Sequence, residues 1–180
     1  EEAGFRYLFF HISSGLLLLA GIMFRYHGEG ASALAMEPLT AALESGDIGA
    51  ILILIAVGIK AAFPGLHTWL KDGYAEATPT GPVWLCAFTT KCAVCMLARL
   101  FPGAEVLIVI GAIMAVFPVF YGMMENDLRR VLCYGKINQI GFMVVGIGIG
   151  TDLAIDGAIA HAFSHVLYKG LLFMGMGAVL

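Results

Sequence analysis

The stretch Gly58-Ile59-Lys60-Ala61-Ala62-Phe63-Pro64-Gly65-Leu66-His67-Thr68-Trp69-Leu70 decides the fold class of this chain. It closes a long apolar run, residues 48–70, yet it holds a lysine in mid-run and a Pro-Gly pair one turn later. Proline lacks a backbone N–H and clashes with the carbonyl four residues earlier, so we predict a helix break at Pro64 and Gly65. Broken backbone at membrane depth is tolerated where it is buried in protein or lines a watery cavity. An ordinary proline kink, with Lys60 reaching toward the interface, is the alternative.

The composition indicates a membrane protein. Of the 180 residues, 60% are hydrophobic and 13% are charged, whereas soluble domains carry about 25% charged residues. The net charge of −3 and the lack of a basic run argue against nucleic acid as a partner. The sequence opens on Glu1-Glu2 and stops inside an apolar run, so we expect an internal piece of a longer protein. Its four cysteines fall mostly in apolar runs and form no disulfide framework.

Six apolar stretches are long enough to cross a bilayer, which takes about 20 helical residues. They cover residues 5–26, 48–70, 82–101, 104–124, 131–150 and 156–180. We therefore predict an all-α integral membrane protein with six transmembrane helices, one of them broken. If the first helix starts in the cytoplasm, the positive-inside rule is satisfied, because four basic residues fall inside and two outside. The inside residues are Arg6, Lys71, Arg129 and Arg130, and the outside residues are Arg25 and Arg99.

Four lysines lie within these apolar runs, namely Lys60, Lys91, Lys136 and Lys169. A charged side chain at the bilayer centre costs roughly 2.5–3.5 kcal/mol, so such residues usually mark a functional path. Burial favours the neutral amine, which lets a lysine load and release protons. Lys136 lies close to the cytoplasmic end of its run, so we expect it to extend to the interface and to be accessory at most.

The third run carries Thr89-Thr90-Lys91 near its centre, followed by Cys92-Ala93-Val94-Cys95. A lysine on the helix after the one that carries Lys60 predicts a chain of sites, and like charges there should oppose each other's protonation. The Cys-x-x-Cys spacing is typical of thioredoxin-like redox motifs, but those belong at solvent-accessible helix starts. Small buried thiols are the better interpretation here.

In the sixth run, His161, His165 and Lys169 recur every four residues and form one polar stripe on a helix. Two histidines at this spacing could hold zinc. No carboxylate or thiol completes the set nearby, and the cationic lysine repels a metal. Because imidazole titrates near neutral pH, a proton relay fits better than a metal site or purely structural histidines.

Several segments together resemble a known family. They are residues 58–70, Asp72-Gly73-Tyr74-Ala75-Glu76-Ala77, Thr89-Thr90-Lys91, residues 125–134 with Asn138-Gln139-Ile140-Gly141, and residues 161–173. This combination is similar to the antiporter-like membrane subunits shared by respiratory complex I and Mrp-type Na+/H+ antiporters. The Thr-Thr-Lys helix and the Asn126-Asp127-Leu128-Arg129-Arg130 loop look closest to the D-type subunits of Na+/H+ antiporters.

The resemblance implies two inverted five-helix repeats, with residues 1–102 ending the first and 103–180 starting the second. It also implies a proton pathway through Lys60, Lys91, His161, His165 and Lys169, with His67 and Lys136 as accessory candidates. A glutamate on a preceding helix, upstream of this sequence, would pair with the lysine of the broken helix. The sequence departs from the family pattern in three places: the proline after Lys60 comes one position early, Lys71 replaces a common proline, and Lys136 replaces a small or hydroxyl residue.

These observations favour proton translocation in the inner (plasma) membrane of a prokaryote, within a complex of several membrane subunits. The first interpretation is a D-type component of a Na+/H+ antiporter. The alternative is a proton-pumping subunit of NADH:quinone oxidoreductase or of a related hydrogenase-type complex. The sequence has no nucleotide loop and no iron-sulfur cysteine set, so we expect no cofactor, metal or redox chemistry in this chain. A haem-binding or purely structural membrane protein is a third class, disfavoured because facing histidines on different helices are not evident.

Overall fold

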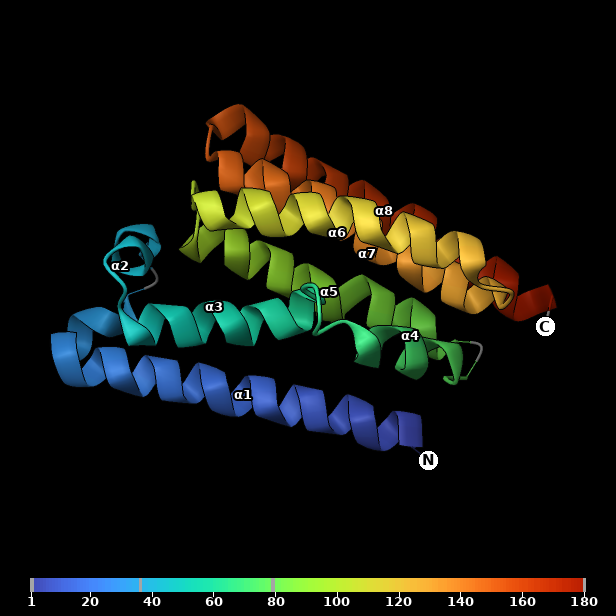
Figure 1. Ribbon diagram of the computed structural model, residues 1–180, viewed down its shortest axis with the longest axis horizontal. Helices are drawn as coiled ribbons and strands as arrows, with labels where there is room; N and C mark the ends of the chain where they lie inside the picture. The colour runs from blue at the N-terminus through green and yellow to red at the C-terminus, as the bar shows by residue number, and fades with distance from the viewer. Residues whose placement is uncertain (1, 36, 79, 180) are drawn as a thin grey trace.

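The computed structural model describes residues 2–35, 37–78 and 80–179, and all regular secondary structure in these ranges is helical. This confirms the predicted all-α class (Figure 1). The elements are α1 (Glu2–Glu29), the 3-10 helix η1 (Gly30–Leu34), α2 (Thr40–Glu44), α3 (Ile48–Ala61), α4 (Thr68–Ala75), α5 (Gly81–Leu100), α6 (Glu105–Met124), α7 (Leu128–Ile149) and α8 (Asp152–Val179).

Five helices in the described ranges are long and apolar enough to cross a membrane, namely α1, α5, α6, α7 and α8. The prediction of six membrane-spanning helices is therefore wrong by one. Residues 48–70 do not form one long helix but divide into α3, with 14 residues, and α4, with eight. A helix of 14 residues rises only about 21 Å, short of the roughly 30 Å of a hydrocarbon core.

The broken helix itself is present, and its interruption spans residues 62–67. Ala62 ends α3 in the left-handed conformation, with φ +63°, so the Phe63 N–H donates to the Gly58 carbonyl at 3.0 Å. This is a Schellman-type helix end. The Phe63 ring then covers Gly58, where a Cβ would lie only 2.5 Å from the ring. Pro64 follows with no N–H to continue a helix, and Gly65 adopts φ +84°.

The helices form two groups joined by α5. Figure 1 shows α1 running antiparallel to α3, and α6, α7 and α8 packed together on the opposite side of α5. The α6–α7 contact is close because glycines face backbone: a Cβ at Gly141 would lie 2.6 Å from the Ala115 nitrogen, and one at Gly111 would lie 2.8 Å from the Val145 nitrogen. Such small residues let membrane helices approach each other directly.

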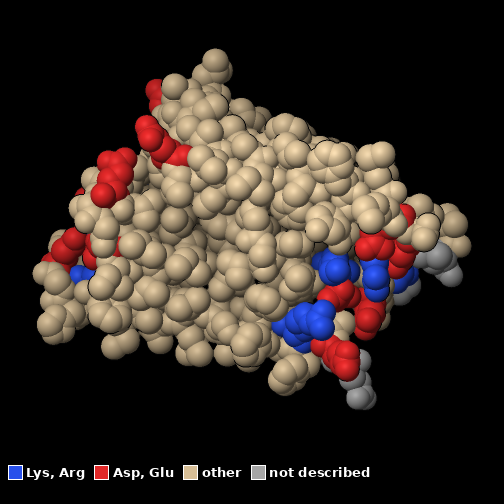
Figure 2. All heavy atoms as spheres, viewed as in Figure 1, with Lys and Arg blue, Asp and Glu red and all other residues tan. Residues whose placement is uncertain are grey.

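Charged side chains gather at the two ends of the bundle. Figure 2 shows an uncharged band between an end rich in Asp and Glu and an end where Lys and Arg cluster, beside the start of α1 and α4. At the basic end, Arg6 pairs with Asp72, and Arg129 donates to the Ala75 carbonyl at 3.1 Å. The charge distribution is that of a multi-pass membrane protein.

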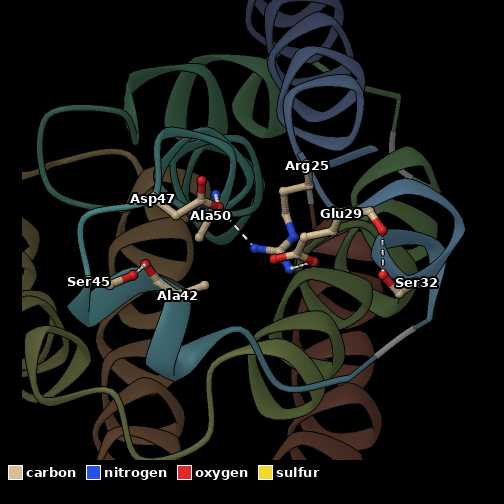
Figure 3. Close-up of polar contacts among 7 residues, drawn as sticks. All are labelled: Arg25, Glu29, Ser32, Ala42, Ser45, Asp47 and Ala50. Atoms are coloured by element: carbon tan, nitrogen blue, oxygen red, sulfur yellow. Dashed lines mark hydrogen bonds and ion pairs between the residues drawn. The ribbon is translucent and has the colours of Figure 1, made fainter. Parts of the chain in front are cut away.

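An ion-pair cluster at the acidic end fixes α1 to the start of α3 (Figure 3). Arg25 on α1 donates to Asp47 at 2.9 Å and to Glu29 at 2.6 Å. Asp47 also accepts from the Ala50 N–H at 3.0 Å, which caps α3. Gly49 lies against the Arg25 stem, because a Cβ there would be 2.5 Å from Arg25 Cγ.

Candidate functional site

Lys91 and His165 meet in the interior of the bundle. Lys91 lies near the midpoint of α5 and His165 near the midpoint of α8, and the two side chains are 7% and 0% exposed. Lys91 Nζ and His165 Nδ1 are in direct hydrogen-bond contact. The pairing joins residues 74 positions apart. Two of the predicted pathway residues are thus brought together by tertiary structure.

The polar stripe of α8 continues on both sides of His165. The His161 and His165 rings lie 6.3 Å apart between centroids, stacked at 29°. Nε2 of each ring is buried and has no hydrogen-bond partner within the described residues. One turn beyond His165, Lys169 is buried and its Nζ donates to the Leu132 carbonyl of α7 at 3.3 Å. Three predicted residues therefore lie on one helix face, as their spacing indicates.

Lys136 does not extend to the interface, so the prediction that it snorkels is wrong. Its side chain is 0% exposed, and Nζ donates to the Tyr74 hydroxyl at 2.8 Å, 4.2 Å from the centroid of the same ring. The physical reason is a partner on another helix. Tyr74 lies on α4, 62 positions away, and supplies the polar contact that the interface would otherwise supply.

Lys60 lies apart from this group. It belongs to the last turn of α3 and lines a cavity of about 110 Å³ between α1, α3 and α5, together with Ser14 and Cys92. Within the part of the chain that the structure describes, Lys60 makes no side-chain hydrogen bond or ion pair, so a direct link to Lys91 is not seen. His67, at the start of α4, packs its ring on Phe117 of α6, with 4.9 Å between centroids.

Two polar side chains in the interior were not singled out from the sequence. Tyr74 has no exposed surface, and its hydroxyl donates to the Leu85 carbonyl at 2.8 Å. His11 is half-buried on α1, and its ring stacks on Tyr7 and packs edge-on against Trp69. His11 could have been found from the sequence, because an ionisable residue inside an apolar run often marks a functional position. Nothing in the local sequence indicates that Tyr74 faces Lys136.

The interior lysines have no carboxylate partner among the described residues. In the described ranges every ion pair is formed by an arginine, and these pairs are Arg6–Asp72, Arg25–Glu29, Arg25–Asp47 and Arg130–Asp127. Lys91, Lys136 and Lys169 are instead held by an imidazole, a phenol and a backbone carbonyl. Uncharged partners stabilise an ammonium less than a carboxylate does, so each amine can release its proton more readily.

Comparison with solved structures identifies the fold. The Mrp complex from Dietzia sp. DQ12-45-1b matches with a TM-score of 0.90 at 23% identity, over 99% of this chain and 35% of that chain. Respiratory complex I from Thermus thermophilus with bound aureothin matches with a TM-score of 0.79 at 20% identity, over 98% of this chain and 40% of that one.

Sequence comparison identifies the family. NADH-quinone oxidoreductase subunit L of Neisseria meningitidis serogroup A is 34% identical over 137 residues, which is 72% of this chain and 20% of that protein. NAD(P)H-quinone oxidoreductase chain 4-1 of Synechocystis sp. is 30% identical over 175 residues, which is 90% of this chain and 33% of that protein. The chain thus spans a fifth to a third of the length of these relatives. Since the family model for NADH:quinone oxidoreductase/Mrp antiporter transmembrane proteins also matches residues 1–180, the chain belongs to that family.

Proposed function

We propose that this chain is the proton-conducting part of a membrane subunit, in which Lys91, His165 and Lys169 exchange protons. The contact between Lys91 Nζ and His165 Nδ1 carries the proposal. It connects α5 with α8 near the midpoints of both helices, and both side chains are buried. Ionisable groups at this depth are costly, which argues for a role in ion passage.

The chemistry of this contact is a proton transfer. When an N–H bond of the Lys91 ammonium breaks, the proton joins the lone pair of His165 Nδ1, which leaves a neutral amine and an imidazolium. Burial without a carboxylate disfavours the ammonium and the imidazolium alike, so neither group retains the proton as it would in water. His161, stacked beside His165, and Lys169, one turn further on, extend the path along α8.

We place Lys60 at the other end of the pathway, next to the helix break at Pro64 and Gly65. Its position beside a small cavity and next to the interrupted helix supports this role, because ion-coupled transporters form their sites at discontinuous helices. A proton on one lysine raises the cost of charging the next, so charge would move stepwise along the row. His67 remains an accessory candidate, at the start of α4.

The whole subunit is proposed to work within a complex of several membrane subunits in a prokaryotic plasma membrane. Two assemblies fit. The names of the sequence relatives support a proton-pumping subunit of an NADH:quinone oxidoreductase, and the TM-score of 0.90 to an Mrp complex supports a D-type component of a Na+/H+ antiporter. In either assembly, residues 1–102 and 103–180 would belong to two inverted repeats that meet near Pro102.

Replacement of Lys169 by alanine in the intact complex tests the proposal. Inverted vesicles are energised with NADH or with a Na+ gradient, and internal acidification is followed with a pH-sensitive dye. We expect the Lys169→Ala complex to assemble and to lose more than about ten-fold in proton transport, because one member of the relay is missing. Lys71→Ala, on α4 and outside the pathway, is the control. Transport at the parental rate by an assembled Lys169→Ala complex would contradict the proposal, and the energy source that drives transport identifies the assembly.

A further inference from the structure

Lys136 is the least exposed of the four lysines in apolar runs, at 0%. Its Nζ lies 2.8 Å from the Tyr74 hydroxyl and 4.2 Å from the centroid of that ring. The ammonium therefore meets both the oxygen and the π face of one side chain. A cation at this distance from an aromatic face is attracted by the ring quadrupole, and more strongly when water is excluded.

The direction of the hydrogen bonds at Tyr74 is determined by the Leu85 carbonyl. A tyrosine hydroxyl has one proton, and here it is donated to Leu85 O at 2.8 Å. The oxygen lone pairs are left to accept, so Lys136 is the donor. Tyr74 thus favours the charged form of Lys136 through its oxygen and through its ring.

Other charges oppose that form. Lys169 Nζ donates to the carbonyl of Leu132, one helical turn before Lys136. The same nitrogen lies beside Gly135, since a Cβ added there would be 2.9 Å from it. Both amines therefore share the same short stretch of α7. Lys91 and His165, which are buried and in contact with each other on α5 and α8, are two further titratable groups of this interior. Like charges in the low-dielectric interior repel, so these groups favour neutral Lys136 whenever they are protonated.

The remaining titratable neighbours of Lys136 are two buried thiols. They are the thiol of Cys86 on α5 and the thiol of Cys133 on α7 itself. On α6, which also packs against α7, the Tyr121 ring stacks on Tyr134. No carboxylate in the described residues pairs with Lys136, so its charge depends on the balance between Tyr74 and the other lysines.

We propose that Lys136 is a further proton-exchanging site of the pathway, with Tyr74 as the positioning residue that holds its charged form. The proposal rests on the proton-conducting function above. When the ammonium of Lys169 or Lys91 loses a proton, the neutral amine of Lys136 takes it up. In the reverse step Lys136 returns the proton to the neutral neighbour. Because Tyr74 belongs to α4, the charge on Lys136 also acts on the shorter half of the broken helix.

Two substitutions at Lys136 separate a proton carrier from a fixed charge. Lys136→Met keeps the length of the side chain without the charge, and Lys136→Arg keeps a charge that is not released. We expect both complexes to transport protons at least about five-fold more slowly than the parental complex, with Lys71→Met as the matched control. Parental transport in Lys136→Met would show that the amine is dispensable, and parental transport in Lys136→Arg would show that it is only a fixed charge. Either result overturns the proposal.

Tyr74→Phe provides a second test if the lysine variants fail to assemble. It keeps the ring face and removes the oxygen that accepts from Lys136, so the ammonium loses one stabilising contact. The alkaline limb of the transport-against-pH profile should move to lower pH by roughly one unit, since a hydrogen bond to a charged group contributes on that order. Tyr134→Phe, whose ring stacks on Tyr121, is the control. An unchanged profile in Tyr74→Phe contradicts the positioning role.

The outcome at Lys169 distinguishes the two proposals. If Lys169→Ala blocks transport and the Lys136 variants do not, the pathway stands and Lys136 is outside it. If an assembled Lys169→Ala complex transports normally, the proton-conducting function itself is wrong, whatever the result at Lys136.

Discussion

Arg25 and Lys91 are both buried cations, but their surroundings differ in kind. Arg25 lies at the acidic end of the bundle, where Asp47 and Glu29 neutralise it. Lys91 lies in mid-bundle, with an imidazole as its partner. A cation near a helix C-terminus stabilises the fold, whereas an uncompensated buried charge costs free energy, so its removal can be neutral or stabilising. The difference indicates that the interior amines serve function and that the Arg25 cluster serves structure.

Replacement of Lys91 by methionine should produce the largest loss of proton transport. If transport were unaffected, the contrast between a functional Lys91 and a structural Arg25 would be wrong. We expect proton transport by the assembled complex to fall by more than about ten-fold, while its thermal stability stays the same or rises, because an uncompensated buried charge is removed. Dye-monitored acidification of inverted vesicles and melting of the purified complex are measured on the same preparation. A melting temperature that falls in step with transport would mean that Lys91 is structural.

The reverse pattern is expected at Arg25. Arg25→Met leaves Asp47 and Glu29 without their partner and should destabilise the fold by about 1 kcal/mol, mainly through loss of two partly buried hydrogen bonds. Transport per assembled complex should remain parental. The shift of the denaturation midpoint, with transport normalised to assembled protein, checks this. A stable variant that transports protons slowly would place Arg25 in the pathway, and Arg25 would then not differ from Lys91 in function.

Protonation of Asp47 at low pH should produce the smallest of these effects, a small loss of stability against unfolding. Partial burial raises its pKa, but hydrogen bonds from the Ala50 N–H and from Arg25 outweigh that contribution, so the pKa lies below its ordinary value of 3.8. The stability from Asp47 is therefore fully present above pH 3.8 and is lost as the pH falls through the lowered pKa. Since the side chain is 37% exposed, we expect at most about 1 kcal/mol. The parental and Asp47→Asn melting temperatures should differ at neutral pH and converge in acid. A difference that persists at low pH would exclude the carboxylate as its source.

The sequence predicted those features that depend on local chemistry. Long apolar runs indicated the membrane helices, Pro64 indicated the break, and the four-residue spacing of His161, His165 and Lys169 placed them on one face. The break begins at Ala62, before the proline, because the Phe63 ring packs on Gly58 and stabilises an early helix end.

The contacts of the lysines could not be predicted in the same way. Lys91 meets a residue 74 positions away, and Lys136 meets one 62 positions away. Such pairs depend on which helices pack against each other. The position of a residue within its apolar run carries no information on that packing. For Lys136 that distance pointed to the interface, whereas the packing of α4 against α7 placed a phenol within reach of its ammonium.

The contact between α5 and α8 is the central claim, and His165→Gln tests it most directly. Glutamine can still accept a hydrogen bond from Lys91, but it does not titrate, so it separates proton exchange from packing. We predict that the His165→Gln complex assembles and melts like the parental complex and transports protons at less than about a tenth of the parental rate. Parental transport by an assembled His165→Gln complex would contradict the account, because the imidazole would then be unnecessary for proton passage.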